Sequence, residues 1–282
     1  MVKDKHVIEA LGKTRIVVED GKVVSVGEPM VDYCPIFAKF HNIQHLNEDD
    51  IRKNIEYRID DFGMCTKNRQ LKMDDMLSVG VSEILRSNLK LGNIDCVVGV
   101  CEGVGTLLMD EADLVQAVGG RVSGLISTTP IPELIEQIDK DNILNPETAE
   151  INQLKGLKMA IDKGYKNIAV TIIPNELIKD IRDYAVDNDV NVYIFVAHTT
   201  AVSKELAEMA FDNADIVTAC ASREVVSLAQ ERKPYYYGSS VPIFAVSENG
   251  RKFLDARLAD VGKNPSVNDY PLDEDNFAKE LV

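Results

Sequence analysis

The sequence of 282 residues contains no apolar run that approaches the 18 or so residues of a membrane-spanning helix, and its first residues, MVKDKHVIEALGK, lack an apolar signal-like stretch. Basic residues are also scarce: 31 Lys and Arg stand against 46 Asp and Glu, so the net charge is −15. A chain this acidic is repelled by phosphate backbones, which argues against nucleic acid as a partner. We therefore expect a cytoplasmic protein that binds neither membranes nor nucleic acid.

Cysteine is uncommon, with five residues, and no two of them form a C-x-x-C pair. In a reducing cytoplasm such cysteines remain thiols that are buried, catalytic or bound to a metal. The rest of the composition, 45% apolar and 27% charged, is that of an ordinary globular chain with a substantial core.

The first 92 residues predict a small α+β portion. Residues 14–27 are β-branched runs on either side of Asp20-Gly21, which predicts a β-hairpin. Helices are predicted over 48–62 and 74–91 from the spacing of their apolar residues.

From residue 93 the pattern becomes that of a larger α/β body, which we expect to extend to residue 268 and to be followed by an acidic tail over 269–282. Apolar strands alternate with helices, and βαβ crossovers of this kind place strands parallel. The predicted fold class is therefore α/β, with a mostly parallel sheet and flanking helices in a Rossmann-like body, added to the smaller N-terminal α+β portion with its hairpin. The strands of the body are predicted at 94–101, 121–127, 167–173, 190–197, 215–219 and 241–246.

Ligands of open α/β sheets bind where the carboxyl ends of strands meet loops and helix N-termini. Three predicted strands end in residues with reactive side chains or a flexible backbone. The residues expected there as catalytic groups are Cys101, His198 and Cys220, and those expected to bind a ligand are Glu102, Gly103, Gly105, Thr106, Thr199 and Ser222.

Each of these residues also has a structural interpretation. Gly103 and Gly105 let backbone amides approach an anion, but C-E-G-V-G-T lacks the G-K-[ST] end of a Walker loop and suits a tight turn equally well. A helix N-terminus would lower the pKa of the Cys220 thiol, or the residue is simply small and buried. His198 suits acid–base catalysis, ligand binding or a satisfied surface position, and Thr199 suits a helix cap or a substrate contact.

Cys34 and Cys65 lie in turn-rich segments of the N-terminal portion. Together with Cys101 and Cys220 they supply four loop thiols, enough for a zinc or iron–sulfur site. Their separations of 31, 36 and 119 residues form no motif, so only the fold can bring them together. Cys96 differs from these, because it lies on the same predicted strand as Cys101, roughly 16 Å away, and we expect it in the core.

Four arginines lie beside these Gly and Cys segments in the acidic chain: Arg58, Arg69, Arg121 and Arg223. A guanidinium group there can hold a carboxylate or a phosphate with two hydrogen bonds. Each arginine can equally be the partner of a neighbouring acid.

Taken in order, several segments resemble the methanogenesis marker protein 8 family, from about residue 6 to about residue 260. The segments are HVIEALGKTRIVVEDGKVVSVGEP, DYCP, FGMCT, the strand with CEGVGT, QAVGGRVSGLISTTPIPE and DIVTACAS. The resemblance implies a cytoplasmic archaeal protein of unknown function that is connected with methanogenesis. The anaerobic setting that it implies makes an oxygen-sensitive cysteine site credible.

Three functions remain open. The first is an accessory or maturation factor with the cysteine-built metal site, whose partners are methanogenesis enzymes or their assembly factors. The second is a cofactor-independent isomerase or racemase with Cys101 and Cys220 as paired thiols; ADIVTACAS resembles a segment of aspartate/glutamate racemases, although Glu-Gly after Cys101 departs from their C-N-T pattern. The third is a non-catalytic protein that binds a small anionic ligand. In each case we expect a homo-oligomer.

Overall fold

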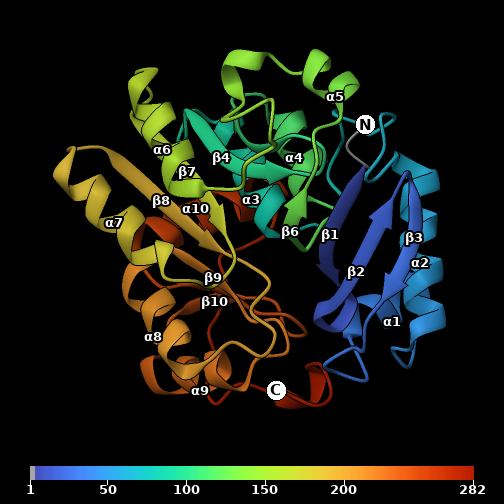
Figure 1. The fold of residues 1–282 in the computed structure, drawn as a ribbon. Helices are drawn as coiled ribbons and strands as arrows, with labels where there is room; N and C mark the ends of the chain where they lie inside the picture. Colours follow the sequence, from blue (N-terminus) through green and yellow to red (C-terminus); the bar gives the residue numbers. More distant parts are fainter. Residues whose placement is uncertain (1–3) are drawn as a thin grey trace.

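The computed structural model describes residues 4–282, which form two β-sheets with helices packed around them (Figure 1). The smaller sheet has four strands in the order β3-β2-β1-β6, and the larger has seven in the order β10-β11-β9-β8-β7-β4-β5. The strands are β1 (Lys5–Ala10), β2 (Thr14–Glu19), β3 (Lys22–Val26), β4 (Cys96–Cys101), β5 (Gly105–Met109), β6 (Gly124–Thr128), β7 (Asn167–Ile172), β8 (Asn191–Val196), β9 (Ile216–Thr218), β10 (Tyr235–Tyr237) and β11 (Ile243–Ala245).

The predicted hairpin over 14–27 is confirmed as β2 and β3, which pair antiparallel on either side of Asp20 and Gly21. Both turn residues have positive φ, at 49° and 70°, as a two-residue turn between twisted strands requires. The small sheet also contains β1 and β6, each paired antiparallel with its neighbour. Its fourth strand thus comes from beyond residue 92, and the division of the chain at that point stays a prediction.

Helix α2 (Glu48–Phe62) confirms the helix predicted over 48–62. The Asn47 side chain accepts a hydrogen bond from a first-turn amide, and Gly63 ends the helix with φ 76°. Ile51 and Ile55 belong to the same apolar cluster as Ile16 of β2. Helix α2 therefore packs against the small sheet (Figure 1).

The larger sheet corrects the predicted fold class. Among residues 4–282, its three central pairings, β9–β8, β8–β7 and β7–β4, are parallel. Towards the two sides of the sheet, β5, β11 and β10 pair antiparallel with their neighbours. The larger sheet is mixed and the small one is antiparallel, so the prediction of a mostly parallel, Rossmann-like body is wrong.

Short strands explain the difference. The segment after Cys101 turns back at Gly103 and Gly105, so residues 105–109 form an antiparallel strand beside β4 where a ligand loop was expected. Residues 235–237 form a further strand, antiparallel to β11. Strands of three to five residues carry too little periodicity to be recognised in a sequence, and their direction depends on long-range pairing.

Helices cover both faces of the larger sheet (Figure 1). Apolar residues of α6 to α9 form a core cluster on one face, and those of α3, α4 and α10 form a cluster on the other. Val97 and Val98, neighbours in β4, belong to different clusters because successive side chains of a strand point to opposite faces. The remaining helices are α1 (Pro35–His41), α3 (Val81–Lys90), α4 (Ala112–Gly119), α5 (Pro132–Gln137), α6 (Gln153–Asp162), α7 (Leu177–Asp187), α8 (Lys204–Asn213), α9 (Arg223–Arg232) and α10 (Glu248–Asp260).

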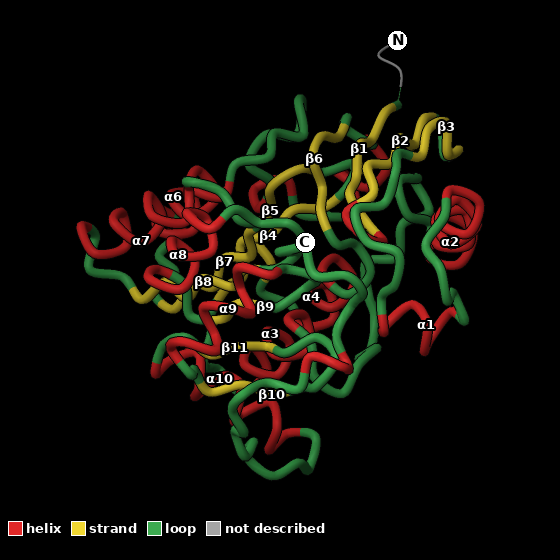
Figure 2. The backbone as a smooth tube through the Cα atoms, turned by 90° about the horizontal axis from the view of Figure 1, so that it is seen from below, coloured by secondary structure: helices red, strands yellow, loops and turns green. Residues whose placement is uncertain are grey.

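The acidic tail over 269–282 packs onto both parts of the fold. Phe277 is 4% exposed and belongs to the core of the larger body. Lys279 forms a bridge with Tyr33 ahead of α1, and the Val282 carbonyl accepts a 3.0 Å hydrogen bond from the Arg223 amide. The C-terminus thus lies between α9 and the end of the small sheet at which α1 lies. In the small sheet, β6 is the strand nearest the larger sheet (Figure 2).

Candidate functional site

Strand β1 covers the edge of the larger sheet at which the site was predicted. Glu9 Oε2 lies 3.1 Å from Nε2 of His198, which follows β8. Closer to the start of β1, the charge of Glu102, which follows β4, acts on the pKa of His6. The predicted residues therefore lie between the two sheets and not along an open crevice.

Residues 101–106 form the tight turn that joins β4 to β5. The two glycines have φ of 79° and 77°. The Gly103 amide donates a 2.7 Å hydrogen bond to Thr128 Oγ1, and Thr106 Oγ1 accepts one of 2.8 Å from the Asn152 amide. These contacts favour the structural interpretation of the turn over the ligand-binding one.

Cys65 and Cys101 belong to a buried polar cluster around an ion pair. Arg69 Nε donates to Glu102 Oε1 at 2.6 Å, and neither side chain is more than 1% exposed. Cys101 Sγ lies 3.4 Å from the Glu102 carbonyl oxygen. Burial raises the pKa of both thiols, and the Glu102 charge raises it further. Both groups are therefore protonated at neutral pH, which does not favour them as nucleophiles.

His6, which was not predicted for any site, lies in the same cluster. It is fully buried, its Nδ1 is hydrogen-bonded to Thr128 Oγ1 at 2.6 Å, and its Nε2 lies 2.8 Å from Asp4 Oδ1. Burial lowers the pKa of His6, against the opposing effect of Asp4 and Glu102. The six-residue strand that carries it was itself missed, so no sequence signal placed His6 in the interior.

Cys220 and Cys34 lie near each other after the end of β9, away from the buried cluster that contains Cys65 and Cys101. Burial raises the pKa of Cys220, and the proximity of Cys34 raises it further. Thr199 Oγ1 accepts a 3.1 Å hydrogen bond from the Cys220 amide and donates one of 2.6 Å to the last carbonyl of β9. Ser222 accepts from an amide in the first turn of α9 and so caps this helix. Thr199 and Ser222 are therefore bonded to the backbone.

The fold does not bring the four loop cysteines together. Within residues 4–282, no three His, Cys, Asp or Glu side chains are grouped so that they could hold a metal ion. The predicted zinc or iron–sulfur site is therefore not supported. Strands β7 and β8 separate β4 from β9, which places the strand ends with Cys101 and Cys220 about 14 Å apart at ~4.8 Å per strand. This spacing argues against both thiols flanking one carbon of a substrate. Cys96 lies in the core, where burial raises its pKa to about 12.

His198 has a left-handed backbone conformation, with φ 60°, and its side chain is 5% exposed. Its hydrogen bond to Glu9 lowers the pKa of that carboxyl group, with further contributions from Lys13 and Arg15. Such conformations are uncommon outside glycine and cluster at functional sites. His198 thus links the two sheets, and its catalytic role stays a prediction.

A cavity of about 380 Å³ lies between the two sheets, where β4 and β7 approach β6. Helices α3, α6 and α7 begin at its wall. Val, Leu and Ile side chains make up most of the lining, and no charged side chain of the described residues belongs to it. The polar side chains of the lining are those of Ser82, Ser123, Gln153, Thr171 and Asn175.

Gln153, the first residue of α6, is the buried polar residue of this cavity for which the described chain provides no side-chain partner. It is 7% exposed, and its side-chain amide makes no hydrogen bond with any of residues 4–282. In the same part of the chain, the backbone amides of Gln153 and Leu154 also have no acceptor, whereas that of Lys155 donates to the cap residue Asn152. A group that can accept hydrogen bonds would satisfy these donors.

Gln153 was not predicted as a site residue, because the start of its helix was predicted six residues too early. The sequence predicts a helix over 147–163, which places Gln153 in its second turn, whereas the observed helix starts at Gln153 after the cap residue Asn152. Asn152 was the available signal, since Asn is favoured at the N-cap. Once the cap is assigned, Gln153 lies in the first turn of α6.

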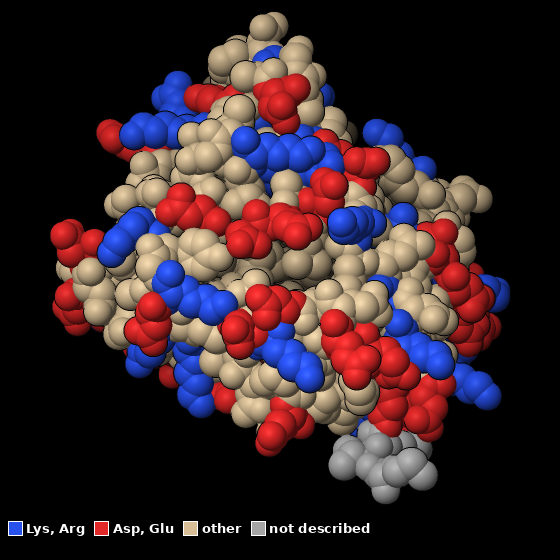
Figure 3. Space-filling view, turned by 90° about the horizontal axis from the view of Figure 1, so that it is seen from above, with Lys and Arg blue, Asp and Glu red and all other residues tan. Residues whose placement is uncertain are grey.

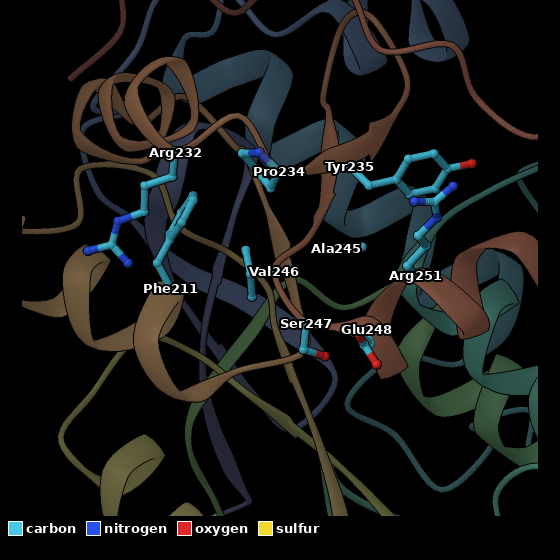
Figure 4. A pocket seen from close by; sticks show the side chains of 9 residues that line it. All are labelled: Phe211, Arg232, Pro234, Tyr235, Ala245, Val246, Ser247, Glu248 and Arg251. Atoms are coloured by element: carbon cyan, nitrogen blue, oxygen red, sulfur yellow. The ribbon is translucent and has the colours of Figure 1, made fainter.

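A second, more open hollow of about 360 Å³ lies near the start of β9 and α10 (Figure 4). Two arginines flank it, and each lies over an aromatic ring: Arg232 over Phe211 and Arg251 over Tyr235. Each guanidinium group also has an acidic partner, at 2.6 and 3.6 Å. With its cations already paired, this hollow offers less to a ligand than the cavity does.

The face of the molecule shown in Figure 3 adds no candidate of comparable quality. On the face shown in Figure 3, acidic and basic side chains are interspersed, without a continuous basic region. Within the part of the chain that the structure describes, no helix combines the length and apolar character needed to cross a membrane. The cavity therefore remains the best candidate site.

The model of the family described as uncharacterized proteins conserved in archaea (DUF2099) matches residues 6–259. The chain belongs to this family. An uncharacterized protein of Methanocaldococcus jannaschii is similar to it, with 42% identity over 286 aligned positions that cover 99% of this chain and 100% of the relative. The family description names no activity, and the methanogenesis marker resemblance stays a prediction.

Proposed function

We propose that this archaeal protein binds a small organic anion in the cavity between its two sheets. The observation that carries the proposal is Gln153, a buried amide without a partner at the start of a helix that opens onto this cavity. The amide groups and the dipole of α6 favour a carboxylate, sulfonate or phosphate at that position. The volume of about 380 Å³ lies in the range of small-molecule sites.

The lining indicates how the ligand lies. Val97 and Val100 of β4 and Leu125 of β6 present apolar surface to the cavity. The anionic group is best placed at α6, because the other two helix starts already carry acceptors of their own. Glu83 in the first turn of α3 accepts hydrogen bonds from two nearby backbone amides, and Asn175 accepts one of 2.9 Å from the first amide of α7. The ligand we infer has an apolar body and one anionic end.

A role as an accessory or maturation factor in methanogenesis is the corresponding biological proposal. It is supported by the resemblance of the sequence segments and not by any contact in the fold. It makes the anionic coenzymes of methanogenesis the first compounds to test.

Calorimetry and thermal unfolding with these coenzymes and with nucleotides would test the proposal. A ligand at 100 times its Kd adds about 2.7 kcal/mol to the free energy of unfolding. We expect Gln153→Leu to weaken binding by about tenfold or more, since the change keeps the size of the side chain and removes its donors. Gln137→Leu, the same change at an exposed position of α5, should bind as the wild type does.

Native mass spectrometry of protein purified from an archaeal host would show a ligand that the panel lacks. Equal affinity of Gln153→Leu and wild type would contradict the assignment of the site. A protein that carries no small molecule and responds to none would contradict the proposed function itself.

A further inference from the structure

Arg58 and Arg121 lie close together where α2 meets the loop between α4 and β6. Arg58 is 8% exposed; its Nε donates to Asn54 Oδ1 at 3.0 Å and its Nη1 donates to the Arg121 carbonyl at 2.7 Å. The Arg121 guanidinium group lies over the Phe62 ring and pairs with Asp61. Two cations are thus held together beside one carboxylate.

Both guanidinium groups keep donors that the protein does not satisfy. Within residues 4–282, no carboxylate lies within ion-pair distance of Arg58, and its Nη2 has no acceptor. The Nε of Arg121 is buried and also has no partner. An unpaired buried charge and unsatisfied buried donors are costly, and native proteins retain few of them. One buried donor without a partner, Arg121 Nε, beside a cation that lacks a carboxylate partner, Arg58, indicates that an acceptor with negative charge belongs here.

The surroundings suit an anion that enters from solvent. Burial lowers the pKa of Arg58 to about 10, and the Arg121 charge adds to this effect, but the group stays protonated at neutral pH. His41 lies at the solvent-facing end of α1, where partial desolvation and the charges of Arg58 and Arg121 lower its pKa. The Phe37 ring lies 5.6 Å from the Arg58 guanidinium carbon. The local charge of Arg58, Arg121 and Asp61 is +1 in a chain of net charge −15.

We propose that Arg58 and Arg121, with His41 at the entrance, form a binding site for a doubly charged oxyanion of the phosphate or sulfate type. Paired guanidinium groups supply the forked donors that such oxygens accept. This site is separate from the proposed Gln153 site, because none of its three residues lines the cavity. The chemistry fits a free anion and the phosphoryl group of a larger molecule alike.

Calorimetry with inorganic phosphate and with sulfate, at constant ionic strength set by chloride, tests the site on the full chain. We expect wild type to bind either anion, and Arg58→Met to weaken this binding by about tenfold or more. Arg121→Gln, which keeps hydrogen-bonding capacity near Asp61, provides a second variant should Arg58→Met not fold. Arg52→Met is the matched control, since Arg52 is on the same helix but already pairs with Glu48.

Nuclear magnetic resonance titration of the imidazoles gives an independent readout. A bound anion should raise the pKa of His41 in wild type and leave it unchanged in Arg58→Met, with exposed His45 as the internal reference. Phenyl phosphate distinguishes the sources: tighter binding than inorganic phosphate supports a phosphoryl-bearing molecule, and equal binding supports the free anion. A wild type that responds to sulfate only as it responds to chloride, or an Arg58→Met variant that responds as wild type does, overturns the proposal. Neither result bears on ligand binding at Gln153.

Discussion

Arg69 and Glu102 form a buried ion pair, and each charge offsets the cost of removing the other from water. Arg69 also donates to the carbonyls of Gln70 and Ala117, both at 2.7 Å. Although burial opposes the charged form, the Glu102 charge raises the pKa of Arg69 above its ordinary value. Because the ordinary pKa of an arginine lies far above neutral, the guanidinium group stays charged at neutral pH when this partner is removed.

We therefore expect Glu102→Gln to destabilise the protein by about 3–5 kcal/mol, the usual effect of breaking a buried pair from one side. Urea unfolding at neutral pH measures this change. Asp212→Asn, which breaks the surface pair with Arg232, is the control and should have little effect. If Glu102→Gln lowers the free energy of unfolding no more than Asp212→Asn does, other groups must stabilise the Arg69 charge.

The thiols show how burial limits the chemistry that a residue type suggests. Cys101 and Cys220 occur at strand ends as expected, yet burial raises the pKa of each. A thiol at a helix start is activated only if the helix field exceeds the cost of desolvation. Burial depends on which segment covers the residue, and here that segment is distant in the sequence.

At the level of elements, the turn between β4 and β5 depends on Gly105. Its φ is 77°, and a Cβ there would lie 2.4 Å from the Ala149 carbonyl carbon and oxygen. Gly92 has a similar φ of 73°, but a Cβ there would meet nothing within 4 Å. The two positions separate the effect of a close contact from that of backbone conformation.

Gly92→Ala should cost about 1 kcal/mol through its left-handed conformation alone. Gly105→Ala should cost about 3 kcal/mol or more, because the backbone of residue 149 cannot move aside as a flexible side chain can. Denaturant unfolding of the two variants tests this difference. If both variants lose a similar free energy of unfolding, the loop around Ala149 must move to accommodate the added methyl group at little cost.

Elements with strong local signals could be predicted, and those defined by distant partners could not. The bounds of α2 follow from its cap, its apolar stripe and its closing glycine. Strand β6 was recognised as a strand, but its pairing with β1, more than 110 residues away, leaves no local trace. The same limit applies to the candidate site: His198 was predicted at a strand end, whereas its partner Glu9 lies in a strand that the sequence did not reveal.

At the level of the whole molecule, the contacts of β1 with the larger body connect the two sheets. Glu9 bonds to His198, and Lys13 Nζ donates a 3.0 Å hydrogen bond to the Thr200 carbonyl. The C-terminal tail adds a second connection at the same end of the small sheet, through Tyr33 and Arg223. The cavity lies between the sheets and is bounded by β6, so the relative position of the two sheets sets its shape.

The pH dependence of stability should report on the β1 contact. The hydrogen bond to His198 lowers the pKa of Glu9 in the folded protein. A carboxyl group with a lowered folded pKa stabilises the protein above its unfolded pKa of about 4.3, and this contribution is lost as the pH falls through the folded value. Glu9→Gln should therefore cost about 1 kcal/mol at pH 6, and the difference from wild type should shrink towards pH 3.

Urea unfolding of the two proteins from pH 6 to pH 3 measures this difference, with Glu136→Gln at an exposed position of α5 as the control that should show none. A gap between wild type and Glu9→Gln that stays constant over this range would mean that the Glu9 charge does not stabilise the contact. If the gap closes as expected, ligand affinity in the cavity should weaken over the same range in wild type, because the contact that holds β1 against the larger sheet also positions β6, its hydrogen-bonded neighbour.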